Sequence, residues 1–590
     1  MKPGRLVILE ILLFAFSFVI LARLYYWQIL KHEDFTVAAK TQIENTVHVG
    51  ASRGRIFSSD GSVLVSNQKA YLVYAILPDI RKLKKQSESE GDFAERIADK
   101  VTPPVLKEKL SNFDKPLQAE KDKLREKIRE RVISQLQLDG LIWVPIIQKI
   151  EENTKEAIEK LDIKGIGFEE DTKRFYPEEN FAASLIGFVG KNDQGEDKGY
   201  FGLEGFFDRQ LKGRSGTLIQ EVDALGRPIL SDSPEGLGAL DGSDIYTSID
   251  KSVQFVVERK LEMGVKRYGA KSGAVIVLEP KSGKLLASSS MPTFNIFDPN
   301  SPSGKEYKNL AISEVYEPGS TFKSITFSAS LDSGVIKPDT ICPCKGPIKA
   351  SGYEVQTSDN KYYPNSTITQ ILQHSDNVGA AFVGKKLGVD KFLKYIYDFG
   401  FGQPTGIDLQ GDEVGIIKDK RDWHEIELVN GSFGQGLSVT PLQMVNAVAT
   451  IANDGKLMKP FVVDKIVGPN NRIEFEGREI RQVIKSQTAK IMQQLLLAAV
   501  AGGEARNIIP KGYRVGGKTG TAQIPIPGGY STKTVASFVG FGPVEKPRFA
   551  MIVVLFEPSA SIFAAETAEP LFFEMLEELY PYWGIPVGNE

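Results

Sequence analysis

The feature that most restricts how this chain can fold is an apolar run next to its N-terminus. Seventeen mostly apolar residues, from Leu6 to Ala22, follow Lys2 and Arg5 and precede an aromatic cluster at 25–27. The run is at the short end for a bilayer span, and clustered aromatic residues are typical of a membrane interface. The basic residues before it predict a single-pass anchor in the cytoplasmic membrane, with a cytoplasmic N-terminus and an extracytoplasmic body. A cleaved signal peptide is the alternative, but bulky residues follow the run where a cleavage site needs small ones.

The rest of the chain has the composition of a globular protein. At 590 residues it is long enough for several domains, and 42% of its residues are apolar. The formal net charge is −3 and there is no long basic tract, so no nucleic-acid partner is predicted. The spacing of Cys342 and Cys344 strains a disulfide, and two thiolates are too few for a zinc site. The sequence contains no recognisable site for a metal or a small-molecule cofactor, so we expect neither.

Changes in residue pattern divide the chain into three parts. The anchor takes residues 1–30, and turns and strands are expected over 31–240, interrupted at about 92–161 by a charge-rich, helix-favouring insertion. Residues 241–590 begin with two strands around a Lys-Ser-Gly turn ("SGAVIVLEPKSGKLLASSS"), continue with helical stretches, and end with strand-like segments such as "RFAMIVVLFEP" and a final helix. Strands at both ends of this part, with helices between them, predict an α+β fold with one antiparallel sheet flanked by helices.

The stretch "YEPGSTFKSITFSASLDSG" holds a serine and a lysine at helical spacing. Pro318 and Gly319 favour a helix start, Gly334 favours its end, and the interior is mostly apolar. Ser320 is therefore expected on the first turn of a buried helix, with Lys323 on the same face and within reach of its hydroxyl. A serine hydroxyl needs a base beside it to act as a nucleophile, and a desolvated lysine can supply that base.

The patterns Ser-x-x-Lys and Lys-[Ser/Thr]-Gly each occur three times, so their context has to decide between the copies. Ser-x-x-Lys recurs at Ser66 and Ser358, and Lys-[Ser/Thr]-Gly occurs at Lys271, Lys281 and Lys518. Lys281 is expected in a hairpin turn, and Lys271 leads into an apolar strand. Around Lys518, in "GGKTGTA", glycines would let a substrate backbone approach closely, as when a sheet edge holds a peptide by strand addition.

The tripeptide Ser-Asp-Asn also occurs twice. Ser358 lies in a polar segment without periodicity, which predicts a surface turn. Ser375 continues the apolar face of Ile368, Ile371 and Leu372, so it is expected to point inward at a helix end or break. The Ser375 copy is therefore the one predicted to belong to the site.

The three elements Ser320-Thr-Phe-Lys323, Ser375-Asp-Asn377 and Lys518-Thr-Gly520, in this order, resemble the signature of the penicillin-binding proteins. The resemblance covers nearly the whole chain and is closest to the class B members. It implies a membrane anchor, an elongated non-catalytic pedestal (a dimerisation-like domain) and a C-terminal transpeptidase domain of the serine β-lactamase-like fold. The further stretches that carry it are "RGRIF" at Arg53, "RFYP" at Arg174, "GLEGFFD" at Gly202 and "SFGQGLSVTPLQ" at Ser432.

The resemblance implies a serine D,D-transpeptidase that acts on peptidoglycan stem peptides ending in D-Ala-D-Ala. Ser320 would be acylated while Lys323 takes its proton, and β-lactams would acylate Ser320 as inhibitors. Ser375, supported by Lys518, would pass a proton to the leaving D-alanine, and Asn377 would bind the substrate amide. Backbone N–H groups, including that of Ser320, would form an oxyanion hole. The remaining substrate-binding residues would be Thr519, Gly520 and Thr521.

Within the family, "SMPTFN" at Met291 and the lack of a long C-terminal extension favour the cell-division branch over the elongation branch. The expected partners are then lipid II-derived stem peptides, a polytopic membrane glycosyltransferase and other divisome membrane proteins. Other classes stay open. A β-lactamase or β-lactam sensor shares the three elements but would not need the pedestal, and a D,D-carboxypeptidase differs only in using water as the acceptor. A silent divisome scaffold is disfavoured by the complete set of serine, lysine and asparagine residues.

Overall fold

The computed structural model describes residues 3–111, 117–193, 195–221, 235–296, 307–357 and 360–588. The chain forms two compact units, one of Met1–Arg53 and Gly213–Gly242 and the other of Gly54–Lys212 and Ser243–Glu590. The smaller unit contains helix α1 (Pro3–Tyr25), a π-helical turn (Tyr26–Leu30), helix α2 (His32–Ile43), and strand β8 (Gly216–Glu221) between β1 (Glu44–Val49) and β9 (Glu235–Leu237). In the described part of the chain, Leu6–Leu30 is the one helical segment long and apolar enough to cross a membrane. The predicted N-terminal anchor is thus present as an exposed helix of sufficient length.

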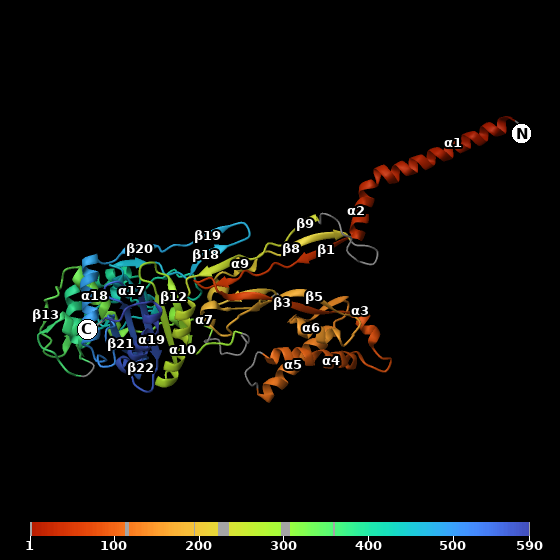
Figure 1. Ribbon diagram of the computed structural model, residues 1–590. Coiled ribbons are helices and arrows are strands. Elements are labelled where there is room, and N and C mark those ends of the chain that lie inside the picture. The colour runs from red at the N-terminus through yellow and green to blue at the C-terminus, as the bar shows by residue number, and fades with distance from the viewer. Residues whose placement is uncertain are drawn as a thin grey trace. The chain divides into compact units, whose positions relative to one another are not determined.

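A seven-stranded sheet supports the first part of the larger unit. Its strands lie in the order β19-β18-β10-β2-β3-β4, with β5 paired to β3 (Figure 1). Strands β18 and β19 come from far along the chain, so this sheet joins the two halves of the unit. The strands are β2 (Ile56–Phe57), β3 (Val63–Ile76), β4 (Trp143–Ile150), β5 (Ile166–Phe175), β10 (Asp244–Thr247), β18 (Val463–Val467) and β19 (Arg472–Glu474).

The charge-rich insertion is only partly helical. It contains α4 (Glu90–Ser111), α5 (Gln118–Leu136) and α6 (Glu152–Glu159), but β4 lies between α5 and α6. The insertion is predicted to be helical from its charge-rich composition and the helical spacing of its apolar residues. "WVPIIQKI" instead has four buried aliphatic residues that pack in one core with the apolar face of α4. Burial against that helix therefore decides the conformation of this stretch.

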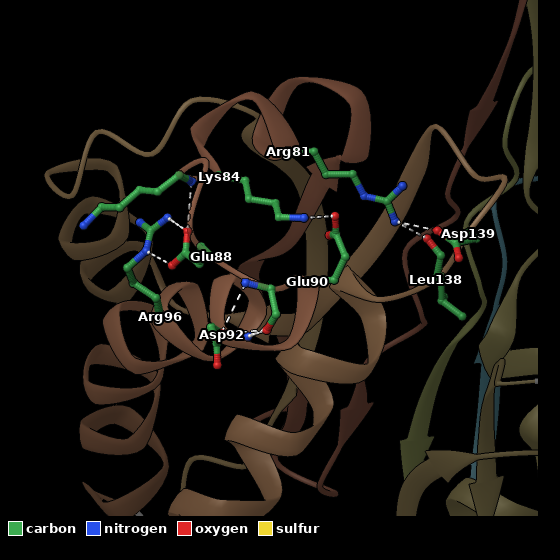
Figure 2. A network of polar contacts seen from close by, with 10 residues as sticks. Arg81, Lys84, Glu88, Glu90, Asp92, Arg96, Leu138 and Asp139 are labelled. Atoms are coloured by element: carbon green, nitrogen blue, oxygen red, sulfur yellow. Dashed lines mark hydrogen bonds and ion pairs between the residues drawn. The ribbon is translucent and has the colours of Figure 1, made fainter.

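Several polar side chains form hydrogen bonds and ion pairs around the start of α4. Figure 2 shows Arg96 donating two hydrogen bonds to the carboxylate of Glu88, at 2.7 and 2.9 Å, and Lys84 paired with Glu90. The side chain of Glu90 is 58% exposed, and an ion pair with so exposed a partner contributes about 0–1 kcal/mol. The apolar face of α4 therefore contributes more to its position than these pairs do.

A five-stranded antiparallel sheet organises the second part of the larger unit. Its order is β12-β11-β23-β22-β21, which leaves β21 at an edge. The expected hairpin is confirmed, because β11 pairs with β12 around a turn that contains Lys281. The strands are β11 (Ser272–Leu278), β12 (Leu285–Met291), β21 (Gly516–Ile526), β22 (Gly529–Gly542) and β23 (Phe549–Phe556).

Helices cover both faces of this sheet. Along β23, Met551 and Val553 pack with α10 (Lys251–Tyr268) and α19 (Ala568–Tyr582), whereas Ile552 and Val554 lie in the core that contains α17 (Pro441–Ala452) (Figure 1). Burial on both faces explains why "RFAMIVVLFEP" is continuously apolar instead of alternating. The predicted α+β fold is confirmed. The remaining helices are α3 (Leu77–Ile80), α7 (Ala183–Ile186), α8 (Gly202–Phe206), α9 (Asp208–Lys212), α11 (Leu310–Ser313), α12 (Lys323–Asp332), α13 (Ile368–Gln373), α14 (Asn377–Leu387), α15 (Val389–Asp398), α16 (Glu425–Gly431) and α18 (Ser486–Ala501).

The two cysteines depart from their prediction, because Cys342 and Cys344 form a disulfide. Cys344 has a φ of +38°, and this turn brings the two Cα atoms to 5.3 Å, inside the usual range for a disulfide. Spacing in the sequence alone does not show that the backbone turns back around Pro343.

Candidate active site

Ser320 lies in a short 3-10 turn, Gly319–Phe322, that leads directly into the buried helix α12. The predicted position on a first helical turn is confirmed, with the refinement that this turn is 3-10. Gly319 donates its N–H to the carbonyl oxygen of Gly434 at 3.0 Å, which fixes the entry to the turn. The Ser320 side chain is half-buried and so remains accessible to a substrate.

Lys323 is fully buried at the centre of the site. Its Nζ lies 3.0 Å from Ser320 Oγ, 3.3 Å from Ser375 Oγ and 2.8 Å from Asn377 Oδ1, and it donates a short hydrogen bond to the Ser375 carbonyl oxygen. Burial lowers the pKa of Lys323 well below its ordinary value, and the nearby Lys518 lowers it further, while Asp376 acts in the opposite direction. The structure therefore brings the two predicted sequence elements together around one amine.

Ser375 occupies the break between α13 and α14, as predicted. Its φ of +52° is in the left-handed region, which is uncommon for a residue with a side chain. The break is held by Asp376, whose carboxylate accepts the N–H of Val378 at 2.8 Å and caps α14. Strained backbone of this kind is found preferentially at functional sites. The alternative copy at Ser358 lies outside the described residues.

The third predicted element lies on the edge strand β21, beside the nucleophile turn. A Cβ added at Gly520 would lie 2.7 Å from the carbonyl oxygen of Pro318, so only glycine lets the strand and the turn approach this closely. In the described part of the chain β21 pairs with β22 alone, and its other edge is open. This geometry suits an extended peptide added along the strand.

The side chains of the edge strand make contacts that the sequence did not predict. Lys518 is 4% exposed and donates to Thr519 Oγ1 at 3.0 Å, and within the described residues it makes no hydrogen bond to Ser375. Burial lowers the pKa of Lys518 to about 8, against the raising influence of Glu569. Thr521 Oγ1 accepts the N–H of Ala564 at 3.0 Å, so its own O–H remains available to donate to a ligand.

The other copies of the sequence patterns lie elsewhere. Lys69, which follows Ser66 in β3, pairs with Glu170 on the surface, and Lys271 pairs with Glu557. His374, next to Ser375 in the chain, stacks on the ring of Tyr363 with centroids 4.0 Å apart.

One carboxylate beside the nucleophile turn was missed by the sequence reasoning. Glu317, three residues before Ser320, is 8% exposed and accepts hydrogen bonds from the Gly436 N–H at 3.1 Å and from the Tyr530 hydroxyl at 3.2 Å. Burial raises the pKa of Glu317 above its ordinary value. Because Tyr530 comes from the β21–β22 hairpin, this contact ties the hairpin to the nucleophile turn. No local pattern in the sequence marks the pair.

The amino-acid sequence matches known protein families and individual known proteins. Residues 273–577 match the model of the penicillin binding protein transpeptidase domain, and residues 48–247 match that of the penicillin-binding protein dimerisation domain. The chain is 31% identical to stage V sporulation protein D of Bacillus subtilis over 99% of this chain and 88% of that protein. It is also 31% identical to peptidoglycan D,D-transpeptidase FtsI of Escherichia coli K12, over 73% of this chain and 71% of that protein.

Solved structures agree with this fold. Penicillin binding protein 3 from Mycobacterium tuberculosis, in complex with aztreonam, superposes with a TM-score of 0.68 at 24% identity, covering 92% of this chain and 98% of that one. Penicillin binding protein 2X from Streptococcus thermophilus gives a TM-score of 0.68 at 26% identity, covering 90% of this chain and 80% of that one. The transpeptidase match alone spans more than half of the chain, and the chain therefore belongs to the class B penicillin-binding proteins and is a serine-type peptidoglycan D,D-transpeptidase.

Proposed function

We propose that Ser320 is the nucleophile of this transpeptidase, that Lys323 is its base, and that the enzyme cross-links peptidoglycan at the division septum. The observation that carries the chemical part is the position of Lys323 Nζ, within hydrogen-bond distance of the hydroxyl groups of Ser320 and Ser375 at once. One buried amine can therefore exchange protons with both serines.

The contacts of Lys323 can all be made by a neutral amine. The Ser375 carbonyl oxygen and Asn377 Oδ1 can only accept hydrogen bonds, so they use the two N–H groups of a neutral amine. The remaining lone pair is then free to accept the hydroxyl proton of Ser320. Burial supports the neutral form because it lowers the pKa of the lysine.

The acylation step follows from this arrangement. Ser320 Oγ attacks the carbonyl carbon of the penultimate D-alanine while its proton moves to Lys323, and backbone N–H groups of Ser320 and Thr521 stabilise the oxyanion. The C–N bond to the terminal D-alanine then breaks, and its amine receives a proton through Ser375. The amine of a second stem peptide attacks the acyl-enzyme and leaves the cross-link, with Ser320 reprotonated.

The substrate would lie along the open edge of β21. Thr519 and Thr521 would hold its terminal carboxylate, Gly520 would keep the strand close to the nucleophile, and the Asn377 side chain would bind the substrate amide. Lys518 would add positive charge for the carboxylate and support Ser375 across the small space between them.

The septal role rests on the relatives and on the anchor. FtsI of Escherichia coli and penicillin binding protein 3 of Mycobacterium tuberculosis are similar along most of the chain. The partners would be lipid II-derived stem peptides, a polytopic glycosyltransferase and other divisome membrane proteins, with Leu6–Leu30 in the cytoplasmic membrane and the catalytic domain outside. A role in sporulation is the second candidate, because a sporulation protein of Bacillus subtilis matches 99% of the chain at 31% identity.

Labelling of the full-length protein in detergent with fluorescent penicillin tests the chemical part. We expect long-lived labelling of the wild type and of Ser66→Ala, whose serine belongs to a Ser-x-x-Lys pattern away from the site, and none of Ser320→Ala. Equal labelling of Ser320→Ala would disprove the assigned nucleophile, and rapid loss of label from the wild type would indicate a β-lactamase.

With a stem pentapeptide and an amine acceptor, a cross-linked product supports transpeptidation, and a hydrolysed product alone supports a carboxypeptidase. For the cellular role, a fluorescent fusion should gather at midcell in dividing cells; confinement to developing spores would favour the second candidate.

A further inference from the structure

A small polar cavity lies directly behind the proposed site. Its volume is about 20 Å³, enough for one water molecule. Ser375 and Lys518 of the proposed site line it, and so do Glu569, Glu504 and the end of α18. The cavity therefore connects two residues of the proposed mechanism with two carboxylates that the mechanism does not use.

Glu569 is the unusual member of this group. It lies in the first turn of α19, is 4% exposed, and has no ion pair within 4 Å in the described part of the chain. Burying a carboxyl group without a direct partner costs free energy, although the N-terminus of a helix offsets part of that cost. A neutral side chain of the same size would fill this position at lower cost, so packing alone does not account for the carboxyl group.

The two lysines of the site need opposite charge states. Lys323 has to be neutral to accept a proton from Ser320, whereas Lys518 has to be protonated to attract a carboxylate and to support Ser375. Both amines are buried, and burial alone would favour the neutral form of both. A protonated Lys518 keeps Lys323 neutral by repulsion, so what is missing is a group that keeps Lys518 protonated.

We propose that Glu569 is a positioning residue of the transpeptidase: across the cavity, it keeps Lys518 protonated and so holds the two lysines in opposite charge states. This inference rests on the roles proposed above for Lys323 and Lys518. The charged groups that act on Glu569 are Lys518 from β21 and Glu504 from the segment after α18. Lys518 favours the ionised carboxylate and Glu504 opposes it.

The ionisation of the pair supports this assignment. Burial raises the pKa of Glu569 to about 8, and it lowers the pKa of Lys518 to about 8. The two groups therefore titrate together over the same pH range. Removing the carboxylate should let Lys518 lose its proton at lower pH.

The test is the pH profile of acylation by fluorescent penicillin, measured on the full-length protein in detergent from pH 6 to 10. Glu569→Gln should move the alkaline fall in rate to lower pH, so that its rate relative to wild type drops at least about threefold between pH 6.5 and 8.5. Glu569→Asp should restore most of the wild-type profile. The matched control is Glu577→Gln, which makes the same charge change at an exposed position of the same helix.

A Glu569→Gln profile that is lowered equally at every pH, or that coincides with that of Glu577→Gln, would overturn the proposal. A second readout needs no activity. Because the pKa of Glu569 is higher in the folded state than its ordinary value of about 4.5, wild type should lose more stability than Glu569→Gln as pH rises from about 4.5 to 8. A Tm difference between the two proteins that does not change with pH would also overturn it. Labelling of Ser320→Ala equal to that of wild type, in contrast, would contradict the proposed function and not the role of Glu569.

Discussion

A buried ion pair in the pedestal gives the sharpest test of what holds this chain together. Arg174 of "RFYP" donates from Nε to Glu204 Oε1 of "GLEGFFD" at 2.7 Å, and from Nη1 to Asn67 Oδ1 at 2.8 Å. The side chains of Arg174 and Glu204 are 6% and 0% exposed. The two stretches, noted separately in the sequence, therefore meet at one desolvated contact.

Glu204→Gln should destabilise the protein by about 3–5 kcal/mol, because it leaves the Arg174 charge buried without its counter-charge. Glutamine keeps the volume and can still accept one hydrogen bond, so the loss comes from the missing charge. Glu170→Gln is the matched control: Glu170 lies on β5, as Arg174 does, and pairs with Lys69 of β3, but the side chains of Glu170 and Lys69 are 76% and 58% exposed. That exposed pair contributes about 0–1 kcal/mol.

Thermal melting of the full-length protein in detergent measures the difference. At about 2–4 °C per kcal/mol for a part of this size, Glu204→Gln should lower Tm by about 6–20 °C and Glu170→Gln by less than about 4 °C. Penicillin labelling below the melting range should be retained by both variants, since neither residue touches the site. If Glu204→Gln and Glu170→Gln have the same Tm, the buried pair does not stabilise the pedestal and the electrostatic reasoning is wrong.

Three further perturbations act at the site itself, and the rate of acylation by penicillin measures each of them. Tyr530→Phe removes a hydrogen bond to the buried Glu317, worth about 1–1.5 kcal/mol, and should slow acylation up to about tenfold; an unchanged rate would mean that the hairpin contact does not position the turn. Gly434→Ala would place a Cβ 2.2 Å from the Gly319 carbonyl oxygen at a φ of +80°, so the nucleophile turn must shift and the rate should fall at least about 100-fold. Lys323→Met removes the base and should cost about 10²–10⁴-fold, with the melting curve preserved.

The sequence predicted the residues that meet in the proposed site but not the residues packed around them. Ser320 and Lys323 could be placed because their spacing and flanking residues define a helix turn, and Ser375 could be distinguished from Ser358 because it continues an apolar helix face. Glu317 and Tyr530 are 213 residues apart and meet only through the fold. Propensity and periodicity are local, so such a pair leaves no trace in either.

The helical periodicity of the sequence could have singled out Glu569, because it lies on the apolar face of its helix. In "AEPLFFEMLEELY" the positions three, four and seven residues after Glu569 are Phe572, Phe573 and Leu576, all buried. A carboxyl group on the apolar face of a helix lowers the stability of the fold, and such a local inconsistency often marks a functional residue. Strand β4 was missed for a different reason. Its apolar segment lies among charged residues, and the helix it packs against, α4, lies earlier in the chain.

Two contacts and one shared cavity link the three parts of the proposed site, so no single element specifies it. Lys323 joins the nucleophile turn to the Ser375 break by hydrogen bonds, and Gly520 joins the turn to β21 by backbone proximity. The cavity with Ser375 and Lys518 on its wall joins the break to β21. Because the charge of Lys518 acts on Lys323, a change of charge at one side of the site alters the ionisation of a residue at another side. Loss of Glu569 should therefore reach Ser320 through Lys518 and Lys323 without moving the nucleophile turn. A crystal structure of Glu569→Gln with Ser320 unmoved, alongside a shifted acylation profile, would fit electrostatic coupling, and a displaced turn would mean that the effect travels through packing instead.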